Sequence, residues 1–293
     1  MATKQEKPRL NRLIELFEQD SPAVGIFAFT VDARAASYVS SSGLDFVVID
    51  LEHTPYDTKS LETYLLAMID KRRIMEKGSL QPDVVPLVRL PSNGRERVQY
   101  MAKQVLDLGV FGIVLPHVDN ADDALAAVKA IRFAHAATDA NPELQGQRGV
   151  GFPWAARYWG IEEPDYGQRA DLWPLDPSGE LVLFCMIETL EGVKNCEAIA
   201  STPGVSGILI GASDLSFCLE GFKHGPKVQE AIQEVLTICQ IANMPCGIVS
   251  PEERIVERLE QGFKILVVGT DAGLPASVTR GVRIVKEFKK TDF

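Results

Sequence analysis

The sequence lacks the features of a membrane protein, a disulfide-stabilised protein and a nucleic-acid-binding protein. Its apolar runs fall short of the roughly 18 to 20 residues that cross a bilayer, and its N-terminus shows no apolar segment followed by a cleavage site. The five cysteines are scattered and form no C-x-x-C pair. The 40 acidic residues outnumber the 30 basic ones, without a clustered basic face. We therefore expect a soluble, cytoplasmic protein with no membrane or nucleic-acid partner.

A dinucleotide-binding glycine motif is also missing. An open, doubly wound sheet would place G-x-G-x-x-G after its first strand, and the sequence has none there. Gly149-Val-Gly151 resembles half of that motif, but Trp154 stands at the third glycine position. Hydrophobic residues make up 46% of the 293-residue chain and charged residues 24%, which is enough apolar surface for a substantial core.

Eight short apolar runs rich in β-branched residues are bounded by turn residues, which is typical of strands. The runs are continuously apolar, as in strands that are buried on both faces of a parallel sheet. We expect strands at Ala23–Phe29, Phe46–Asp50, Val84–Arg89, Gly112–Pro116, Leu181–Ile187, Gly207–Gly211, Pro245–Val249 and Lys264–Gly269.

Segments with helical spacing of apolar residues lie between most of these runs. Eight strands that alternate with helices predict an α/β protein, a (β/α)8 TIM barrel. We expect one domain over residues 1–293, with long loops at about 71–83 and 141–180. The helical segments are Ser60–Arg72, Arg95–Leu108, Ala121–Ala136, Lys227–Ala242 and Glu252–Gln261.

Charged side chains occur at the ends of four of the strand-like runs. A barrel gathers the C-terminal ends of its strands around one mouth, where reactive groups lie. Each charge also has a structural explanation, such as an ion pair for Arg89 or a helix cap for Asp214, but charges at four equivalent ends favour an active site. The residues are Asp50, Glu52 and His53 at the second run, Arg89 at the third, Glu188 after the fifth and Asp214 after the sixth.

Glu188 and Asp214 are the candidate metal ligands. Two carboxylates with no cysteine and no obvious histidine ligand favour Mg²⁺ or Mn²⁺, with Co²⁺ as a further candidate. Open coordination positions would allow a 2-oxo acid such as pyruvate to chelate, and the metal would stabilise its enolate. Arg89 would add positive charge at the enolate oxygen. Backbone N–H groups at Gly211, Ala212 and Ser213 would bind the substrate carboxylate.

His53 is the candidate acid/base group. It lies three residues from Asp50, which could orient it, and a metal-bound water activated by the pair is an equal alternative. No lysine stands at the C-terminal end of an expected strand, because Lys264 is at a strand start. This position argues against a Schiff-base aldolase.

Several motifs resemble the HpcH/HpaI family of class II pyruvate aldolases, in order along nearly the whole chain. That resemblance implies reversible cleavage of a 4-hydroxy-2-oxo acid into pyruvate and an aldehyde. It also implies a swapped C-terminal helix and a homohexamer, with Asp107 near a subunit contact close to the site. The motifs are Phe46–His53, Val88-Arg89, Lys103–Gly109, Leu115–Asp122, Arg148–Gly151, Met186–Thr189, Ile210–Ser216 and Val267–Asp271.

The sequence departs from the family pattern at two places. Gly211-Ala212-Ser213-Asp214 replaces the usual Gly-Pro-Ala-Asp. Aromatic residues gather after Gly151, where simpler members carry small ones. We expect them to form an apolar wall for a bulky aldehyde, the alternative being that they pack the loop or a subunit contact. They are Phe152, Trp154, Tyr158 and Trp159.

Three other readings remain open. A decarboxylase or cyclase of the oxaloacetate type would use the same pyruvate enolate. A citrate-lyase or malyl-CoA-lyase activity would need basic residues at the mouth for CoA, where Arg95 and Arg97 are the nearby cluster. A barrel retained for binding or assembly would have an incomplete metal site.

Overall fold

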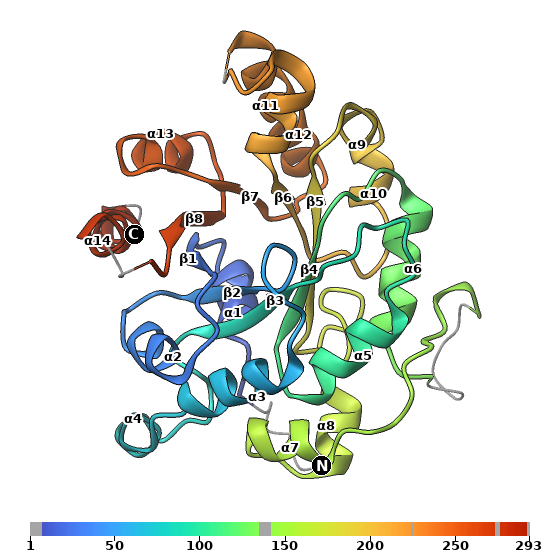
Figure 1. The fold of residues 1–293 in the computed structure, drawn as a ribbon, viewed down its shortest axis with the longest axis vertical. Helices are drawn as coiled ribbons and strands as arrows, with labels where there is room; N and C mark the ends of the chain where they lie inside the picture. Colours follow the sequence, from blue (N-terminus) through green and yellow to red (C-terminus); the bar gives the residue numbers. More distant parts are fainter. Residues whose placement is uncertain (1–7, 135–141, 224, 273–275, 292–293) are drawn as a thin grey trace, which may run out of the picture.

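The computed structural model describes residues 8–134, 142–223, 225–272 and 276–291. Eight parallel strands close into a barrel in the order β1 to β8, and helices surround it (Figure 1). The predicted TIM barrel is therefore confirmed. The strands are β1 (Ala23–Ala28), β2 (Phe46–Asp50), β3 (Val85–Arg89), β4 (Gly112–Leu115), β5 (Val182–Ile187), β6 (Gly207–Ile210), β7 (Cys246–Val249) and β8 (Ile265–Thr270).

All eight strands lie within one residue of the ranges expected from the sequence. Their side chains are buried along almost the whole length of each strand, since one face points into the barrel and the other meets the helices. This burial explains why the runs are continuously apolar. The register pairs Asp50 with Arg89 and Ile187 with Ile210, so the C-terminal ends of neighbouring strands form one rim.

Helices differ more from the expected ranges than strands do. The segment expected at Ser60–Arg72 is two helices, because the Asp70 side chain accepts hydrogen bonds from the N–H groups of Arg72 and Arg73 and starts a new one. Other helices begin or end a few residues earlier or later, and Ala136 lies outside the described residues. The helices that follow strands on the outer layer include α2 (Ala33–Ser40), α3 (Thr58–Ala67), α5 (Gln99–Asp107), α6 (Ala121–Ile131), α9 (Leu190–Lys194), α10 (Cys196–Ala200), α11 (Ala212–Glu220), α12 (Pro226–Ile241), η2 (Glu252–Arg254), α13 (Ile255–Glu260) and α14 (Ala276–Thr291).

The two stretches expected as long loops contain helices of their own. They add α4 (Lys71–Lys77) before β3, and η1 (Pro142–Leu144), α7 (Pro153–Trp159) and α8 (Glu163–Arg169) before β5. Together with α1 (Arg12–Glu18), α4, α7 and α8 lie near the N-terminal ends of the strands (Figure 1). They therefore lie at the opposite end of the barrel from the rim where the charged strand ends meet.

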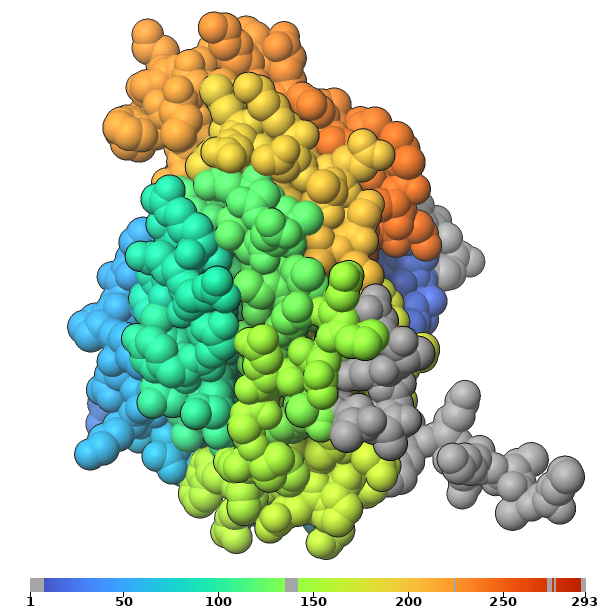
Figure 2. Space-filling model, turned by 90° about the vertical axis from the view of Figure 1, so that its right-hand side faces the viewer, coloured from blue at the N-terminus to red at the C-terminus, as the bar shows by residue number. Residues whose placement is uncertain are grey.

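The final helix, α14, packs against β1, β8 and α13 of its own chain. The swapped C-terminal helix that the resemblance implies is therefore not found in this structure, because α14 covers the barrel of its own chain. At the other side of the molecule α11 stands out from the barrel, as the orange region at the top of Figure 2 shows. In the part of the chain that is described, no helix is both long and apolar enough to cross a membrane.

Candidate active site and metal centre

Five successive strands deliver polar side chains to one rim of the barrel. Asp50 and Arg89 end β2 and β3, His117 follows β4, Glu188 follows β5, and Asp214 lies in the first turn of α11 after β6. A cavity of about 390 Å³ opens at this rim and is lined by Arg89, Glu188 and Asp214 among others. The sequence prediction that the strand-end charges meet is correct in the structure.

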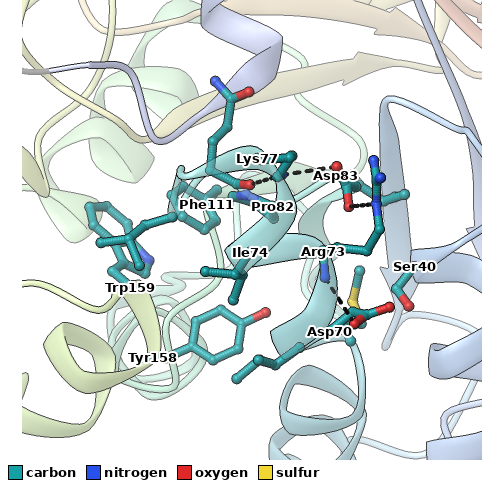
Figure 3. Close-up of a pocket in the computed structure, with 15 residues that line it drawn as sticks. Ser40, Asp70, Arg73, Ile74, Lys77, Pro82, Asp83, Phe111, Tyr158 and Trp159 are labelled. Atoms are coloured by element: carbon teal, nitrogen blue, oxygen red, sulfur yellow. Dashed lines mark hydrogen bonds and ion pairs between the residues drawn. The ribbon is translucent and has the colours of Figure 1, made fainter.

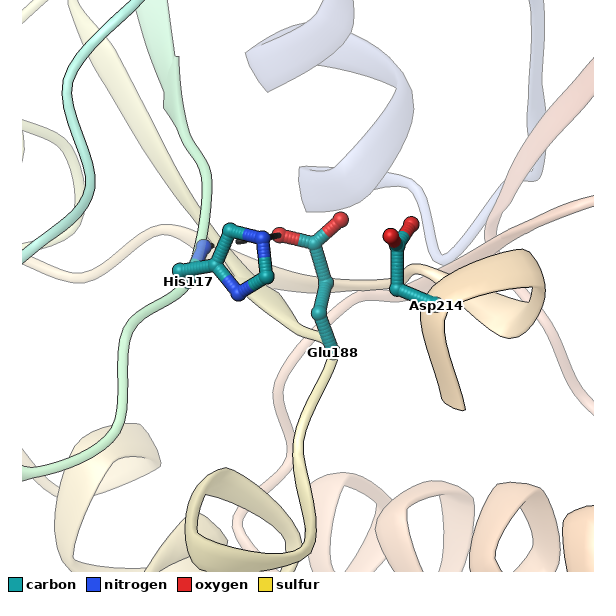
Figure 4. A group of neighbouring side chains, drawn as sticks. All are labelled: His117, Glu188 and Asp214. Carbon is teal, nitrogen blue, oxygen red and sulfur yellow. Dashed lines mark hydrogen bonds and ion pairs between the residues drawn. The ribbon is translucent and has the colours of Figure 1, made fainter. Parts of the chain in front are cut away.

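Glu188, Asp214 and His117 form a cluster that is able to hold a metal ion (Figure 4). One ligand atom from each residue lies within 4.8 Å of the others. Glu188 is buried, whereas Asp214 is exposed and His117 is half-buried. A set of two carboxylates and one imidazole leaves coordination positions open for a bidentate substrate.

The surroundings of Glu188 favour a positive charge beside its carboxylate. Burial raises the pKa of Glu188 from 4.5 to about 8, against the backbone hydrogen bond from His117, and the negative charge of Asp214 raises it further. A divalent cation between the two carboxylates would remove the cost of burying their charge. The residues present therefore fit a divalent metal.

His117 is a potential ligand that the sequence analysis did not identify. Its backbone N–H donates to Oε2 of Glu188 at 2.7 Å, and its Nε2 lies 3.9 Å from the same oxygen. Its φ of 48° is in the left-handed region, which is uncommon for a residue other than glycine and often marks a functional site. The signal was present in the sequence, because Leu115-Pro116-His117 places a histidine directly after the fourth strand.

Gly211 leaves room for the Glu188 carboxylate. A Cβ atom at Gly211 would lie 2.4 Å from Cγ of Glu188 and 2.6 Å from its Oε1. Helix α11 starts directly after it, and among the described residues no side chain caps this helix. Ala212 and Ser213, which carry the first N–H groups of α11, line the same cavity as Glu188.

Arg89 lies between two acidic side chains at the rim. Its Nε donates to Oδ1 of Asp50 at 2.6 Å, and its Nη1 lies 2.9 Å from Oε2 of Glu52. The guanidinium also stacks over the Phe27 ring, 4.5 Å from its centroid. These contacts hold the planar group in one orientation beside Glu188, whose pKa its charge lowers.

His53 is positioned differently from the expectation. The buried Asp50 accepts the backbone N–H of His53 at 3.1 Å, but the imidazole Nε2 lies 3.6 Å from Oε2 of Glu52. The expected Asp50–His53 side-chain pair is thus replaced by a Glu52–His53 pair, since Asp50 is already bonded to Arg89. The His53 side chain is 64% exposed. Burial raises the pKa of Glu52, against the charges of Arg89 and His53.

The structure places Asp107 away from this cavity. It ends α5, just before β4 begins, so it lies at the N-terminal end of the barrel. Its Oδ1 accepts a hydrogen bond of 2.8 Å from Nη2 of Arg148. The role at a subunit contact that the resemblance implies remains a prediction about an assembly.

The aromatic residues after Gly151 also lie at the N-terminal end of the barrel. Trp159 stacks on Phe111 with ring centroids 4.5 Å apart, and its indole N–H donates to the carbonyl of Gly109 at 2.8 Å. Tyr158 and Trp159 border a cavity of about 70 Å³ beside α4 (Figure 3).

Two further residues of this aromatic segment were expected to contact the aldehyde. Phe152 packs between Phe133 and Tyr166, each with ring centroids 5.2 Å away. Trp154 is 38% exposed on α7. Within one chain, neither Phe152 nor Trp154 is brought to the cavity that contains Glu188. Phe152, Tyr158 and Trp159 instead pack within the loop segment, which was the alternative to an apolar wall for the aldehyde.

The chain is similar to known proteins in both sequence and fold. A family model described as HpcH/HpaI aldolase/citrate lyase matches residues 23–277. The chain is 32% identical over 270 residues to a 5-keto-4-deoxy-D-glucarate aldolase of Citrobacter koseri, covering 91% of this chain and 92% of the relative. An HpcH/HpaI aldolase/citrate lyase family protein of Burkholderia cenocepacia has a solved structure that superposes with a TM-score of 0.74 at 26% identity, covering 96% and 98%.

A more distant structure shares the fold. It is the citrate lyase beta subunit of M. tuberculosis in complex with oxaloacetate and magnesium, which superposes with a TM-score of 0.55 at 13% identity, covering 92% of this chain and 99% of that one. The family model spans all eight strands and the site residues on their ends. The chain therefore belongs to the HpcH/HpaI aldolase/citrate lyase family.

Proposed function

We propose that this protein is a divalent-metal-dependent pyruvate aldolase. It would reversibly cleave a 4-hydroxy-2-oxo acid into pyruvate and an aldehyde. The observation that carries the proposal is the meeting of Glu188, Asp214 and Arg89 in one cavity at the C-terminal rim. The 32% identity to 5-keto-4-deoxy-D-glucarate aldolases supports it.

Glu188 and Asp214 would hold the metal, with His117 as a third ligand. A divalent cation held by these residues would supply Lewis-acid stabilisation of negative charge on the keto oxygen of a 2-oxo acid. Carboxylate ligands suit Mg²⁺ and Mn²⁺, and an imidazole nitrogen extends the candidates to Co²⁺.

The residues around the metal ligands would orient the 2-oxo acid. Ala212 and Ser213 at the start of α11 line the cavity, and their N–H groups would bind its carboxylate. Arg89, fixed by Asp50 and Glu52, would direct positive charge at the oxygen on which negative charge develops. This charge is already oriented before the substrate binds, so little reorganisation is needed.

Proton transfer from the C4 hydroxyl, which becomes the carbonyl of the departing aldehyde, would involve the Glu52–His53 pair. Nε2 of His53 lies beside Oε2 of Glu52, and a histidine exchanges protons near neutral pH. In the cleavage direction, Nε2 would take the proton from the C4 hydroxyl as the C3–C4 bond breaks, and C3 of the resulting enolate would take up a proton to give pyruvate. In the addition direction it would return the proton to the same oxygen.

The assembly is part of the same proposal. We propose a single domain over residues 1–293 in a cytoplasmic homohexamer. Asp107, Phe152 and Trp154 lie far from their own chain's site, so they would contribute to catalysis only if the hexamer brings them to a neighbour's site. Light scattering of the purified protein would measure the number of subunits.

The decisive experiment is pyruvate release from 4-hydroxy-2-oxo acids, with and without added Mg²⁺ or Mn²⁺, followed with lactate dehydrogenase. We expect metal-dependent release that Glu188→Gln and Asp214→Asn abolish. Release that is unchanged in both variants would refute the metal role. Oxaloacetate and malyl-CoA, tested in parallel, represent the decarboxylase and CoA-thioester alternatives, and faster turnover of either one would replace the proposal.

A further inference from the structure

Phe27, near the end of β1, lies against the guanidinium group of Arg89. Phe27 is 6% exposed, and Cζ of Arg89 lies 4.5 Å from the centroid of its ring. Both residues line the cavity that contains Glu188. In a TIM barrel, alternate strands contribute side chains to the same interior layer. β1 and β3 flank β2, so the barrel itself brings Phe27 and Arg89 together.

The polar contacts of Arg89 leave one rotation of its guanidinium group free. Nε donates to Asp50 at 2.6 Å, and Nη1 lies 2.9 Å from Oε2 of Glu52. Two contacts fix two points of a planar group, which can still turn about the line between them. A ring face stacked on the plane restricts that rotation, because it attracts the delocalised charge over its whole surface. Among the described residues Nη2 of Arg89 has no acceptor, so it is the nitrogen left for a substrate.

The position of the Phe27 ring depends on Asp271, which directly follows β8. Asp271 is 7% exposed, and its N–H donates to the carbonyl of Phe27 at 3.1 Å. Its Oδ1 accepts the N–H of Phe29 at 3.0 Å, and its Oδ2 accepts the N–H of Thr30 at 2.8 Å. One buried residue therefore holds the backbone from Phe27 to Thr30 through three hydrogen bonds.

An irregularity between β1 and β8 brings Asp271 to this place. The two strands lie side by side in Figure 1. Gly25 pairs with Val267, whereas Phe27 pairs with Thr270, so β8 contains one residue more than β1 over this stretch. Gly269, in the extra stretch, has a φ of 151°, which side chains other than glycine rarely adopt. Such bulges redirect the residues that follow them and are frequent beside active sites.

We infer that Phe27 is a positioning residue for Arg89, and that Asp271 in turn holds Phe27 in place through the backbone of β1. The inference rests on the proposed function, which assigns Arg89 to the oxygen on which negative charge develops. The ring keeps the guanidinium plane turned towards that oxygen. Its loss should therefore weaken the binding of an enolate-like anion more than the binding of pyruvate itself.

The test compares the affinities for oxalate and for pyruvate in the presence of Mn²⁺, measured by calorimetry. Oxalate is a planar dianion that resembles the enolate of pyruvate. We expect Phe27→Leu to weaken oxalate binding about 3- to 30-fold, the range of a cation–π contact, and pyruvate binding less. Phe27→Tyr keeps the ring and should bind oxalate as the unaltered protein does. Phe27→Met keeps most of the volume without the ring and should resemble Phe27→Leu. Full recovery in Phe27→Met would show that only volume matters and would overturn the inference.

A double-mutant cycle shows whether the ring acts through Arg89. In the Arg89→Met background, Phe27→Leu should cause no further loss of oxalate affinity, because the guanidinium that the ring holds is gone. The same fold-loss in both backgrounds would overturn the positioning role. If Phe27→Leu does not fold, Phe27→Met takes its place in the cycle.

Asp271→Asn tests the second step. Asparagine keeps the shape of the side chain, but its amide nitrogen does not accept the N–H of a neighbour. We expect a selective loss for oxalate that disappears in the Arg89→Met background. An equal loss for oxalate and pyruvate would show that Asp271 only stabilises the fold.

Phe184→Leu is the matched control. Phe184 is a strand residue that is 1% exposed, and its ring lies 6.2 Å from that of Phe17 on α1, at the other end of the barrel. This variant should lose stability as Phe27→Leu does, with unchanged oxalate affinity. A loss of oxalate affinity equal to that of Phe27→Leu would show that any buried ring has the same effect, against the inference.

Failure of the aldolase proposal gives a different result. Exchange of the pyruvate methyl protons with deuterated solvent proceeds through the enolate and needs no aldehyde. No metal-dependent exchange in the unaltered protein would refute the proposed function. With exchange present, Phe27→Leu should lower its kcat about 3- to 30-fold at a nearly unchanged KM for pyruvate. An unchanged kcat would refute only the role of Phe27.

Discussion

His117 contacts Glu188 through both its backbone and its side chain. The N–H donates to Oε2 at 2.7 Å, and Nε2 lies 3.9 Å from the same oxygen. His117 adopts a left-handed φ of 48°. The carboxylate is thereby oriented by a neighbouring strand end, and an imidazole is placed beside the metal-binding position. Removing the imidazole therefore tests whether His117 influences which metal the site prefers.

Replacing His117 should change which metals bind. In His117→Asn the backbone N–H to Glu188 is kept, because asparagine tolerates left-handed φ, but the imidazole is lost. We expect affinity for Co²⁺ to fall about 10- to 100-fold and affinity for Mg²⁺ to fall less, since imidazole favours later transition metals. Calorimetric titration and the visible spectrum of bound Co²⁺ would measure this. An equal loss for both metals would show that His117 only orients Glu188.

The raised pKa of Glu188 predicts a pH-dependent stability for the metal-free protein. A pKa raised from 4.5 to about 8 contributes stability that is present below pH 4.5 and is lost as pH rises through 8. The contribution is on the order of 5 kcal/mol. Chemical unfolding of chelator-treated protein from pH 5 to 8.5 would measure the slope, which Glu188→Gln should flatten. The same slope in the variant would contradict the assignment to Glu188.

Metal affinity should rise with pH as Glu188 loses its proton, whereas the stability of the metal-free protein falls over the same range. A metal binds the deprotonated carboxylate, so binding releases a proton below pH 8. We expect the apparent Kd of Mg²⁺ to fall about tenfold for each pH unit up to that point. Proton release, measured by calorimetry in buffers of different ionisation enthalpy, would check it. Binding without proton release at pH 6 would show that Glu188 is already charged.

Arg89→Lys should reduce catalysis much more than stability. Lysine keeps the charge but does not contact Asp50 and Glu52 at the same time, as Arg89 does at 2.6 and 2.9 Å. We expect kcat to fall about 10²- to 10³-fold, the effect of removing one oriented group at a developing negative charge. Steady-state pyruvate release would measure it. Arg73→Lys on the distant α4 is the control and should be as active as the unaltered protein.

The positions of the strands were predictable because burial on both faces leaves an unbroken apolar run. β2 is Phe-Val-Val-Ile-Asp, with its first charge at the rim. The same logic located Glu188 and Asp214, since a barrel brings every strand end to one mouth. Helix boundaries were less predictable because a single cap decides them, as Asp70 does when it starts α4.

Partners at the site were harder to predict than its residues. Asp50 is close to His53 in the sequence, yet its carboxylate pairs with Arg89 from the next strand. His117 directly follows the fourth strand, but that position alone does not distinguish a metal ligand from an ordinary turn residue. The location of Trp159 depends on where the segment before β5 folds back, which is a tertiary property that composition does not specify.

Gly211→Ala should weaken metal binding through a steric effect. The added Cβ would lie 2.4 Å from Cγ of Glu188, so the carboxylate must move. We expect metal affinity to fall about tenfold or more, with a loss of about 1 to 3 kcal/mol in unfolding free energy. Gly149→Ala is the matched control, because its Cβ would meet nothing nearer than Cδ of Lys103 at 3.9 Å. Calorimetric titration would compare the two variants.

Trp159→Ala should lower stability without changing aldehyde preference at its own chain's site. Trp159 is 2% exposed, stacks on Phe111 and donates to the carbonyl of Gly109, so its removal leaves a cavity and an unpaired carbonyl. We expect a loss of about 3 to 5 kcal/mol in unfolding free energy. The relative kcat/KM for short and bulky aldehydes should be unchanged, because the cavity with Glu188 lies at the other end of the barrel. Chemical unfolding and an aldehyde series measure the two quantities separately, and a selective loss of bulky aldehydes would place Trp159 at an active site after all.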